Sequence, residues 1–414
     1  MAKQYLKTSK SDGYAEANRE LGRFHKRLTL GKSFKGIFVD SSHDEIKTFA
    51  EDKSRNLERL FLSNSKKHGF DWALRLIVRR VADCNLEFPV KSESPAREEL
   101  LAALARVFDP QWWRRQIKNR QDLILEQIQI ELGKVHKQAG IYASDQCVTR
   151  KLQDWKRSEE ILASLEAEND LGQIFNLLDL AQKGVSNLIN RRNELMTRIA
   201  GLEAFAKDQG HQAVFITITA PSRYHSHHAN PCRPNNKYEG FSPRETHAYL
   251  NTVWQRIRAK WNRQDIIPYG FRVVEPHHDG TPHWHLLLFI QPEKVKRLVE
   301  ITREYALAES PNEKGAQQRR VTVENIDPNK GSAAGYIAKY IAKNIDGEHL
   351  GEDLYGRDAI ESATRIRAWA SNWKIRQFQP IGGPSVTAWR ELRKLKSDDA
   401  LETILANINL DDFN

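Results

Sequence analysis

The stretch from Val273 to Ile290, VVEPHHDGTPHWHLLLFI, constrains the fold of this chain more than any other. An Asp-Gly turn separates two runs rich in β-branched and apolar residues, a pattern typical of a β-hairpin. The second run continues unbroken through apolar residues after its two histidines, as a strand in a protein core does. We therefore predict two antiparallel strands around a turn in the core of a sheet.

Two histidines, His283 and His285, stand on the second of these strands. Successive side chains of a strand point to opposite faces, so the two imidazoles share one face and Trp284 takes the other. Two imidazoles on one face of a rigid strand can hold a divalent metal ion. The same spacing also occurs in ordinary buried or surface histidines, so the pair alone leaves both interpretations open.

The turn determines whether a carboxylate joins the pair. If HDG forms a three-residue loop with its glycine in the left-handed conformation, Glu275 lies opposite His283 on the metal-facing side. A two-residue Asp-Gly loop would instead place Glu275 opposite Trp284. In the first case Glu275, His283 and His285 form a ligand set with open coordination positions, which suits Mg²⁺ or Mn²⁺ better than a structural Zn²⁺.

A second polar pattern follows in GYIAKYIAK, where Tyr336, Lys339, Tyr340 and Lys343 have the spacing of one helical stripe. The opposite side carries isoleucine and alanine, which suits packing on a sheet. A phenol titrates near pH ~10, and adjacent ammonium groups favour its phenolate form. The alternative is an ordinary amphipathic helix with tyrosines at its boundary.

The sequence pattern changes near residue 206, from helical periodicity to strands that alternate with helices. Residues 1 to about 200 have helical periodicity, and alternating spacings of three and four predict one long helix packed on a partner. The apolar positions of that helix are Ile174, Leu178, Ala181, Val185, Leu188, Leu195, Ile199 and Leu202. After AKDQGHQ, strand patterns such as AVFITITAP alternate with helices, one of them opened by a capping box of Ser242 and Glu245.

We therefore predict an α+β fold, with a mainly antiparallel sheet flanked by helices and preceded by a large all-helical N-terminal region. The predicted limits are 1–206 for the helical region, 207–346 for the core that carries the chemistry, and 347–414 for a mostly helical extension that packs on the core.

The composition indicates the class of partner and the cellular compartment of the protein. Among 414 residues, Lys and Arg number 64 and Asp and Glu 54, and the net charge of +10 favours a polyanionic partner, most often nucleic acid. Three distant cysteines do not form a disulfide framework. The N-terminus resembles no signal peptide, and no apolar run approaches the ~20 residues of a membrane helix. We expect a soluble intracellular protein without a membrane partner.

The order of these motifs resembles that of the HUH endonucleases that start rolling-circle replication, most closely the replication gene A proteins of tailed bacteriophages. FITIT at Phe215–Thr219 is similar to the family's first motif, PHWHLLLF carries its paired histidines, and GYIAKYIAK its paired tyrosines and lysine. Flanking stretches such as DPQWWRRQIKNRQ and KIRQFQPIGGP are similar too. The resemblance covers most of residues 100–395 and is thinnest over the first hundred.

The resemblance implies a site-specific endonuclease and strand transferase with an HUH-type core. A tyrosine would attack the scissile phosphate of single-stranded origin DNA and remain joined to the 5′ end. Tyr336 and Tyr340 would alternate in this role, and Lys343 with Lys339 would stabilise phosphate charge or serve the leaving oxygen. The cofactor would be Mg²⁺ or Mn²⁺ on Glu275 and the two histidines.

The resemblance also implies contacts and partners. The residues expected beside the DNA are Thr217, Thr219, Arg223, Tyr224 and Arg376. The sequence contains no Gly-x-x-x-x-Gly-Lys-Ser/Thr phosphate loop, so a host helicase and the host replication machinery are the expected partners. The expected location is the cytoplasm of a bacterial host cell.

Several alternatives remain open at the level of the sequence. A plasmid relaxase or transposase of the same superfamily would share the motifs, whereas a metal-dependent phosphodiesterase would use water and form no protein–DNA adduct. A replication accessory that only binds DNA would need no metal. The loop RYHSHHANPC could form a separate zinc site or a polar loop, and the paired tryptophans of QWWRRQIKNRQ could stack on DNA bases or anchor a helix.

Overall fold

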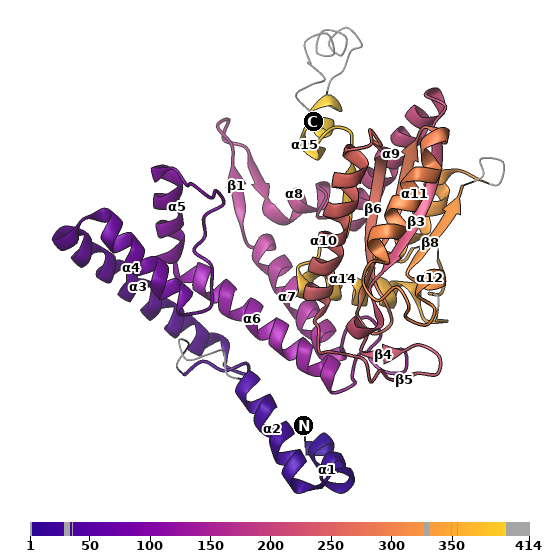
Figure 1. Ribbon diagram of the computed structural model, residues 1–414. Helices are drawn as coiled ribbons and strands as arrows, with labels where there is room; N and C mark the ends of the chain where they lie inside the picture. The colour runs from indigo at the N-terminus through magenta and orange to yellow at the C-terminus, as the bar shows by residue number, and fades with distance from the viewer. Residues whose placement is uncertain are drawn as a thin grey trace. The chain divides into compact units, whose positions relative to one another are not determined.

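The computed structural model describes residues 2–28, 34, 36–326, 331–348, 350–353 and 355–394. The chain divides into two compact units, residues 1–134 and 135–414, each with its own hydrophobic core (Figure 1). No helix of the described residues is long and apolar enough to cross a membrane.

The named elements of the first unit are all helices, joined by turns and loops. Its helices are α1 (Ala2–Ser11), α2 (Gly13–Leu28), α3 (His43–His68), α4 (Phe70–Ala82), α5 (Arg97–Val107) and α6 (Pro110–Glu131). Trp112 and Trp113 of α6 are buried in the core of this unit, and the Trp113 indole N–H donates to the Val107 carbonyl over 2.8 Å. The paired tryptophans therefore anchor a helix and are not available for base stacking.

The second unit carries the sheet. Its helices are α7 (Asp145–Ala163), α8 (Leu177–Lys183), α9 (Leu188–Asp208), α10 (Pro243–Asn262), α11 (Pro292–Ala306), α12 (Ala316–Arg319), α13 (Ala333–Ile345), α14 (Ala359–Trp373) and α15 (Val386–Leu392). Its strands are β1 (Glu166–Glu168), β2 (Ile174–Asn176), β3 (Gln212–Thr219), β4 (His227–His228), β5 (Arg233–Pro234), β6 (Tyr269–Pro276), β7 (Pro282–Ile290), β8 (Val321–Asn325) and β9 (Phe378–Ile381).

The main sheet has five strands in the order β8-β3-β7-β6-β9, and every neighbouring pair is antiparallel. The predicted α+β class, with an antiparallel sheet flanked by helices and a helical N-terminal region, is confirmed. The predicted capping box at Ser242 and Glu245 is also present and begins α10.

The single long helix predicted between Ile174 and Leu202 is wrong. The segment instead contains β2, which pairs with β1 in a short hairpin, and two separate helices, α8 and α9. Gly184 follows the end of α8, and the Asn187 side chain accepts hydrogen bonds from the backbone N–H groups of Ile189 and Asn190 to begin α9. A cap of this kind starts a new helix even where the apolar spacing continues across it.

The second unit begins at Val135, ahead of the limit at residue 206 that the change from helices to strands suggested. The reason is packing, because α7 packs on α14 and α9 packs on α13. These helices therefore belong to the same compact unit as the sheet.

The two faces of the sheet are covered by different helices. On one face, α9 and α13 pack on a core that includes Phe215, Phe271 and Leu287. On the other face lie α10 and α11 (Figure 1). There Trp254 of α10 meets Trp284 edge to face. Side chains that alternate along β6 and β7 therefore face either the tyrosine helix α13 or the α10–α11 layer.

Candidate metal and tyrosine site

The β6–β7 hairpin has the register that brings a carboxylate to the histidines. Glu275 is paired with His283, and the His277 N–H donates to the Thr281 carbonyl over 2.7 Å. The loop between them has three residues, with Gly280 at φ +82° in the left-handed region. This is the loop on which the predicted position of Glu275 depended.

Glu275, His283 and His285 form a compact group. One potential ligand atom from each lies within 4.8 Å of the other two. Among the described residues, these three side chains are the ones gathered closely enough to hold a metal ion. The Glu275 Oε2 atom is 3.5 Å from His285 Nε2 and 3.9 Å from His283 Nε2. All three residues are buried. Two imidazole nitrogens and one carboxylate oxygen are a donor set that Mg²⁺ or Mn²⁺ can share with substrate oxygens.

Neighbouring side chains orient the imidazoles. The Thr217 hydroxyl lies 2.9 Å from His285 Nδ1, which leaves Nε2 facing Glu275. Thr219 is the strand partner of His283, so both threonines of the first motif lie on the site's face of the sheet. Thr217 thereby positions a candidate ligand, as the second partner of a metal-bound histidine does.

The tyrosines of α13 approach the same face. The Tyr340 ring lies 4.3 Å from the His285 ring, centroid to centroid, and Phe215 of β3 contacts both Tyr336 (4.7 Å) and Tyr340 (5.2 Å). The Tyr336 hydroxyl donates a hydrogen bond to the Glu324 carboxylate on β8. The two phenols therefore belong to one site but have different surroundings.

The lysines of α13 take separate positions. Lys339 Nζ lies 4.5 Å from the centroid of the Tyr336 ring and 5.0 Å from that of Tyr340. Lys343 Nζ lies 3.1 Å from Glu275 Oε2. The structure thus brings together all four predicted residues of the helical stripe, with Lys339 on the phenols and Lys343 on the carboxylate.

Besides Glu324, the hydrogen-bond partner of Tyr336, two more site residues had escaped the sequence analysis. The Asn344 amide donates to the Glu275 carboxylate and, over 2.6 Å, to the Tyr340 carbonyl. The Gln377 amide in turn donates to Asn344 Oδ1 over 3.0 Å. A polar amide at a buried position of an otherwise apolar helix face was the signal that could have identified Asn344.

Charge and burial set the titration of these groups. Burial works to raise the pKa of Glu275, but Lys343 and the hydrogen bond from His285 outweigh it and lower the pKa to about 2. Burial, then the charges of Glu275 and Glu324, raise the pKa of Tyr340 to about 12. The lysines therefore do not by themselves favour the phenolate, contrary to the expectation from the sequence. Burial and the imidazoles of His277 and His285 hold the pKa of His283 well below its ordinary value, so the ring is neutral, as a metal ligand must be.

The remaining predicted DNA contacts lie apart from this group. Tyr224 is buried, and Arg223 pairs with Glu309 (2.7 Å) and Glu239 (3.2 Å). Arg376 is exposed just before β9. The structure does not bring these three residues to the metal-ligand group, and their contact with DNA stays a prediction.

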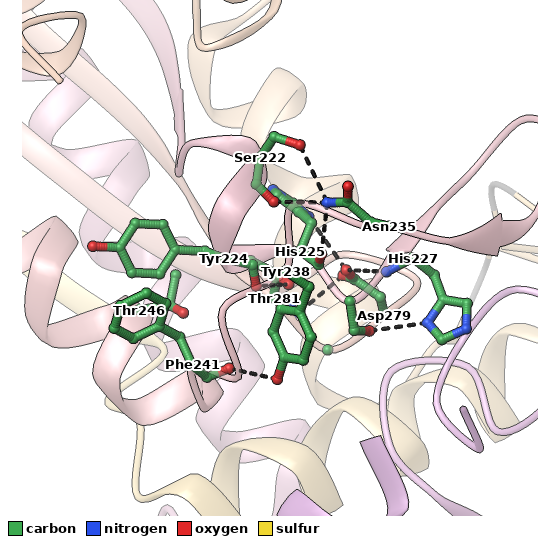
Figure 2. A network of polar contacts seen from close by, with 12 residues as sticks. Ser222, Tyr224, His225, His227, Asn235, Tyr238, Phe241, Thr246, Asp279 and Thr281 are labelled. Atoms are coloured by element: carbon green, nitrogen blue, oxygen red, sulfur yellow. Dashed lines mark hydrogen bonds and ion pairs between the residues drawn. The ribbon is translucent and has the colours of Figure 1, made fainter. Parts of the chain in front are cut away.

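The histidine-rich loop after β3 is tied to the hairpin tip and does not form a second metal group among the described residues. Figure 2 shows Asp279 at the centre of this network. Its carboxylate pairs with His225 Nδ1 over 3.3 Å and accepts a hydrogen bond from the Thr281 N–H over 3.1 Å. The Asn235 amide donates to the His225 carbonyl over 2.8 Å. The network fixes the loop against the turn that sets the register of Glu275.

The fold and the site define a class: an α+β protein whose antiparallel sheet presents a histidine–carboxylate group to a helix with two tyrosines. Comparison with known protein families identifies the family of the chain. The chain belongs to the bacteriophage replication gene A protein (GPA) family, whose profile matches residues 44–348.

Curated relatives carry names from phage replication. The chain is 44% identical over 312 residues to the probable replication protein P12 of Pseudoalteromonas phage PM2, covering 73% of this chain and 48% of the relative. It is 42% identical over 313 residues to the replication gene A protein of Escherichia phage 186, covering 74% and 45%. A relative from Salmonella paratyphi A, 36% identical over 333 residues (79% and 42%), is named a probable replication endonuclease from a prophage-like region. The chain thus spans less than half the length of these relatives, and no solved structure matches it significantly.

Proposed function

We propose that this protein is a metal-dependent DNA nicking and joining endonuclease of the HUH type, which starts rolling-circle replication of phage DNA through a covalent 5′-phosphotyrosine intermediate. The observation that carries the proposal is the placement of α13 on the sheet. One helix puts the Tyr340 ring 4.3 Å from the His285 ring and Lys343 Nζ 3.1 Å from the Glu275 carboxylate. A nucleophile and a metal-ligand group thus share one site.

The donor set fits a divalent cation. Glu275 is ionised at neutral pH and His283 is neutral. His283 Nδ1 is buried without a hydrogen-bond partner in the described structure, whereas His283 Nε2 lies 2.9 Å from His285 Nε2, so both Nε2 atoms are close to each other and to the Glu275 carboxylate. Mg²⁺ or Mn²⁺ held by Glu275, His283 and His285 would polarise the scissile phosphate and offset the Glu275 charge that raises the pKa of Tyr340.

The chain's own residues supply the transfer. A tyrosine oxygen forms a bond to phosphorus, the bond from phosphorus to the 3′ oxygen breaks, and that oxygen takes a proton from Lys343 or Lys339 and leaves as a 3′ hydroxyl. Glu324, which accepts the hydrogen bond of Tyr336, is placed to take the phenol proton. Lys343 and Lys339 offset the charge that develops on the phosphate.

Two tyrosines allow two cuts without release of the DNA. Their ring centroids are 6.3 Å apart, and both rings contact Phe215. One tyrosine would hold the parental 5′ end while the other cuts the regenerated origin, and joining would use the energy of the phosphotyrosine bond. Thr217, Thr219, Arg223, Tyr224 and Arg376 remain the proposed DNA contacts.

The alternatives share parts of this site. A plasmid relaxase or transposase of the same superfamily would use the same groups, and membership of the phage replication family argues against both. A hydrolase that activates water would have no use for two phenols beside its metal ligands. The proposal further implies the replication machinery of a bacterial host, including a helicase, as partners in the host cytoplasm.

The test is adduct formation on single-stranded fragments of the source replicon with Mn²⁺ or Mg²⁺, with and without chelator, on a denaturing gel. Wild type is compared with Tyr336→Phe, Tyr340→Phe and the double variant. We expect a metal-dependent band of DNA-linked protein that disappears only when both tyrosines are replaced. Cleavage without such a band would replace the proposal with a water-using phosphodiesterase.

A further inference from the structure

A row of arginines lies beside the site in the second unit, and the proposed function does not use most of it. We call Arg191, Arg198, Arg367 and Arg376 the arginine strip. Three of its members stack on aromatic rings: Arg191 on Phe378 (5.3 Å), Arg198 on Trp389 (5.7 Å) and Arg367 on Trp155 (4.5 Å). Guanidinium groups interleaved with aromatic rings are typical of surfaces that track single-stranded nucleic acid.

The strip has no direct ion pairs within the described part of the chain, although Glu194 lies near Arg198, and Asp346 and Glu159 lie near Arg367. Among the described residues, none of its four arginines forms an ion pair with a carboxylate within 4.0 Å. Glu194, beside Arg198, is already held by Arg390 over 2.9 Å. Burial lowers the pKa of Arg198, Glu194 opposes this effect, and the nearby positive charges of Arg390 and Arg376 lower the pKa further. Such a concentration of positive charge is complementary to a polyanion.

An apolar cavity of about 500 Å³ adjoins the strip at Arg198. Its lining includes Phe205, Tyr269, Phe271 and Trp389. Phe205 is 52% exposed and meets the Tyr269 ring edge to face at 5.5 Å. An aromatic cavity next to a guanidinium group matches a nucleobase, which stacks on rings while its phosphate meets a cation.

The strip and the cavity lie along the helix that packs on the tyrosine helix. Arg192, next to Arg191, pairs with Asp346 at the C-terminal end of α13 over 2.6 Å. From Arg191 to Phe205, α9 extends about 21 Å at 1.5 Å per residue. A strand that leaves the cleavage site near Lys343 can therefore follow α9 to the cavity.

We propose that this cavity binds a nucleobase of single-stranded DNA whose backbone lies along the arginine strip. It is a base-binding subsite outside the cleavage site, formed by α9, the start of β6, the segment after β9 and α15. The identity of the ligand as DNA rests on the proposed function. The competing occupant is an apolar side chain of a protein partner.

The test measures equilibrium binding, with the Tyr336→Phe/Tyr340→Phe protein as background so that no adduct forms. Fluorescence anisotropy follows a labelled 30-nucleotide oligo(dT) and an abasic oligomer of the same length. We expect Trp389→Ala to weaken oligo(dT) binding about tenfold, as the loss of one base stack does, and to leave abasic binding unchanged. Arg198→Ala/Arg376→Ala should weaken both and reduce the slope of log Kd against log salt by about 1.4, or about 0.7 per phosphate contact.

Two further variants serve as an independent test and as a control. Phe205→Ala alters an exposed ring and should reproduce the base-dependent loss without risk to the core. Arg258→Ala removes an exposed arginine of α10, on the other face of the sheet, and should change neither affinity nor slope. Unchanged oligo(dT) binding in Trp389→Ala and Phe205→Ala would overturn the subsite and leave the cavity to a protein partner. Failure of the wild type to form an adduct would refute the proposed function without affecting this readout.

Discussion

At the scale of single residues, Glu275 links the two halves of the site. It lies on β6 beside the histidines of β7 and receives Lys343 and Asn344 from α13. Its carboxylate stays ionised although it is buried, because the lysine and the imidazole outweigh the effect of burial on its pKa. The site is thus assembled around one buried negative charge.

Replacement of one candidate ligand should separate chemistry from binding. We expect His283→Ala to abolish adduct formation and to change the Kd for single-stranded DNA by less than about threefold, since the residue is buried and its role is with the metal ion. The two quantities are measured on the same oligonucleotide by denaturing gel and by anisotropy. Equal loss of both would mean that the histidine is structural.

The buried pair of His225 and Asp279 predicts a pH dependence of stability. Burial works to lower the pKa of His225, but Asp279 outweighs it and the pKa is raised. The contribution of this histidine is therefore fully present below its unfolded pKa of about 6.5 and is lost as the pH rises through the raised folded value. The pKa of Asp279 is lowered despite burial, mainly by His225, so its contribution is present above about pH 4 and is lost as the pH falls.

Asp279→Asn should reveal the pH range in which the pair of His225 and Asp279 stabilises the fold. We expect the variant to lose about 3 kcal/mol of unfolding free energy at pH 6, as breaking a buried ion pair does, and less at pH 9. Urea unfolding at both values gives the difference between variant and wild type. A difference that is the same at pH 6 and pH 9 would show that His225 does not titrate as described.

Much of the site was predictable from single residues, because the positions of these residues follow from the local sequence pattern. The face shared by His283 and His285 follows from strand alternation, and the stripe of Tyr336 and Tyr340 follows from helical periodicity. Glu275 depended on one turn, which Gly280 settles at φ +82°. Gln377 and Glu324 were not predictable because their roles depend on which elements meet in space, whereas the amide of Asn344 on an apolar helix face was a signal that was missed.

At the scale of elements, α9 holds the tyrosine helix at both ends. The Glu203 carboxylate accepts hydrogen bonds from the backbone N–H groups of Ala333 (3.1 Å) and Ala334 (3.0 Å) at the N-terminus of α13. At the other end Arg192 pairs with Asp346 over 2.6 Å. An acid at the helix N-terminus and a base near its C-terminus both complement the helix dipole, and together they set where the phenols lie.

Loss of the N-terminal contact should therefore affect both stability and chemistry. We expect Glu203→Ala to lower the unfolding free energy by about 1 kcal/mol, as the loss of a helix cap does, and to slow adduct formation at saturating DNA. Glu203→Gln keeps one acceptor and should recover part of both. The control is Lys207→Ala, which removes the exposed partner of Glu203 and should change stability by less than about 0.5 kcal/mol. Slowed chemistry in the control as well would place the effect in the Glu203–Lys207 ion pair.

The strands and most helices of the second unit were predictable, and the exceptions have identifiable causes. Strand patterns at β3, β6 and β7 and the capping box of α10 follow from local sequence. The break between α8 and α9 was missed because apolar spacing was weighed above Gly184 and the Asn187 cap. The inclusion of α7 in the second unit depends on its contacts with α14, which no local pattern contains.

At the scale of the whole molecule, a bound cation should stabilise the folded chain. A ligand at 100 times its Kd adds about 2.7 kcal/mol to the free energy of unfolding. We expect Mn²⁺ to raise the melting temperature of wild type and chelator to reverse the shift, with little response in Glu275→Gln. Melting curves by circular dichroism measure this without DNA. An equal shift in the variant would place Mn²⁺ binding elsewhere.

The central claim is that a tyrosine of α13 becomes joined to DNA, and peptide mapping of the adduct tests it most directly. Trypsin cleaves after Lys339, so Tyr336 and Tyr340 fall on separate peptides, 331–339 and 340–343. After reaction, nuclease trimming and digestion, mass spectrometry should find a nucleotide phosphate on one or both of these peptides. A nucleotide on any other peptide, or cleaved DNA with no modified peptide, would contradict the assignment of the nucleophile.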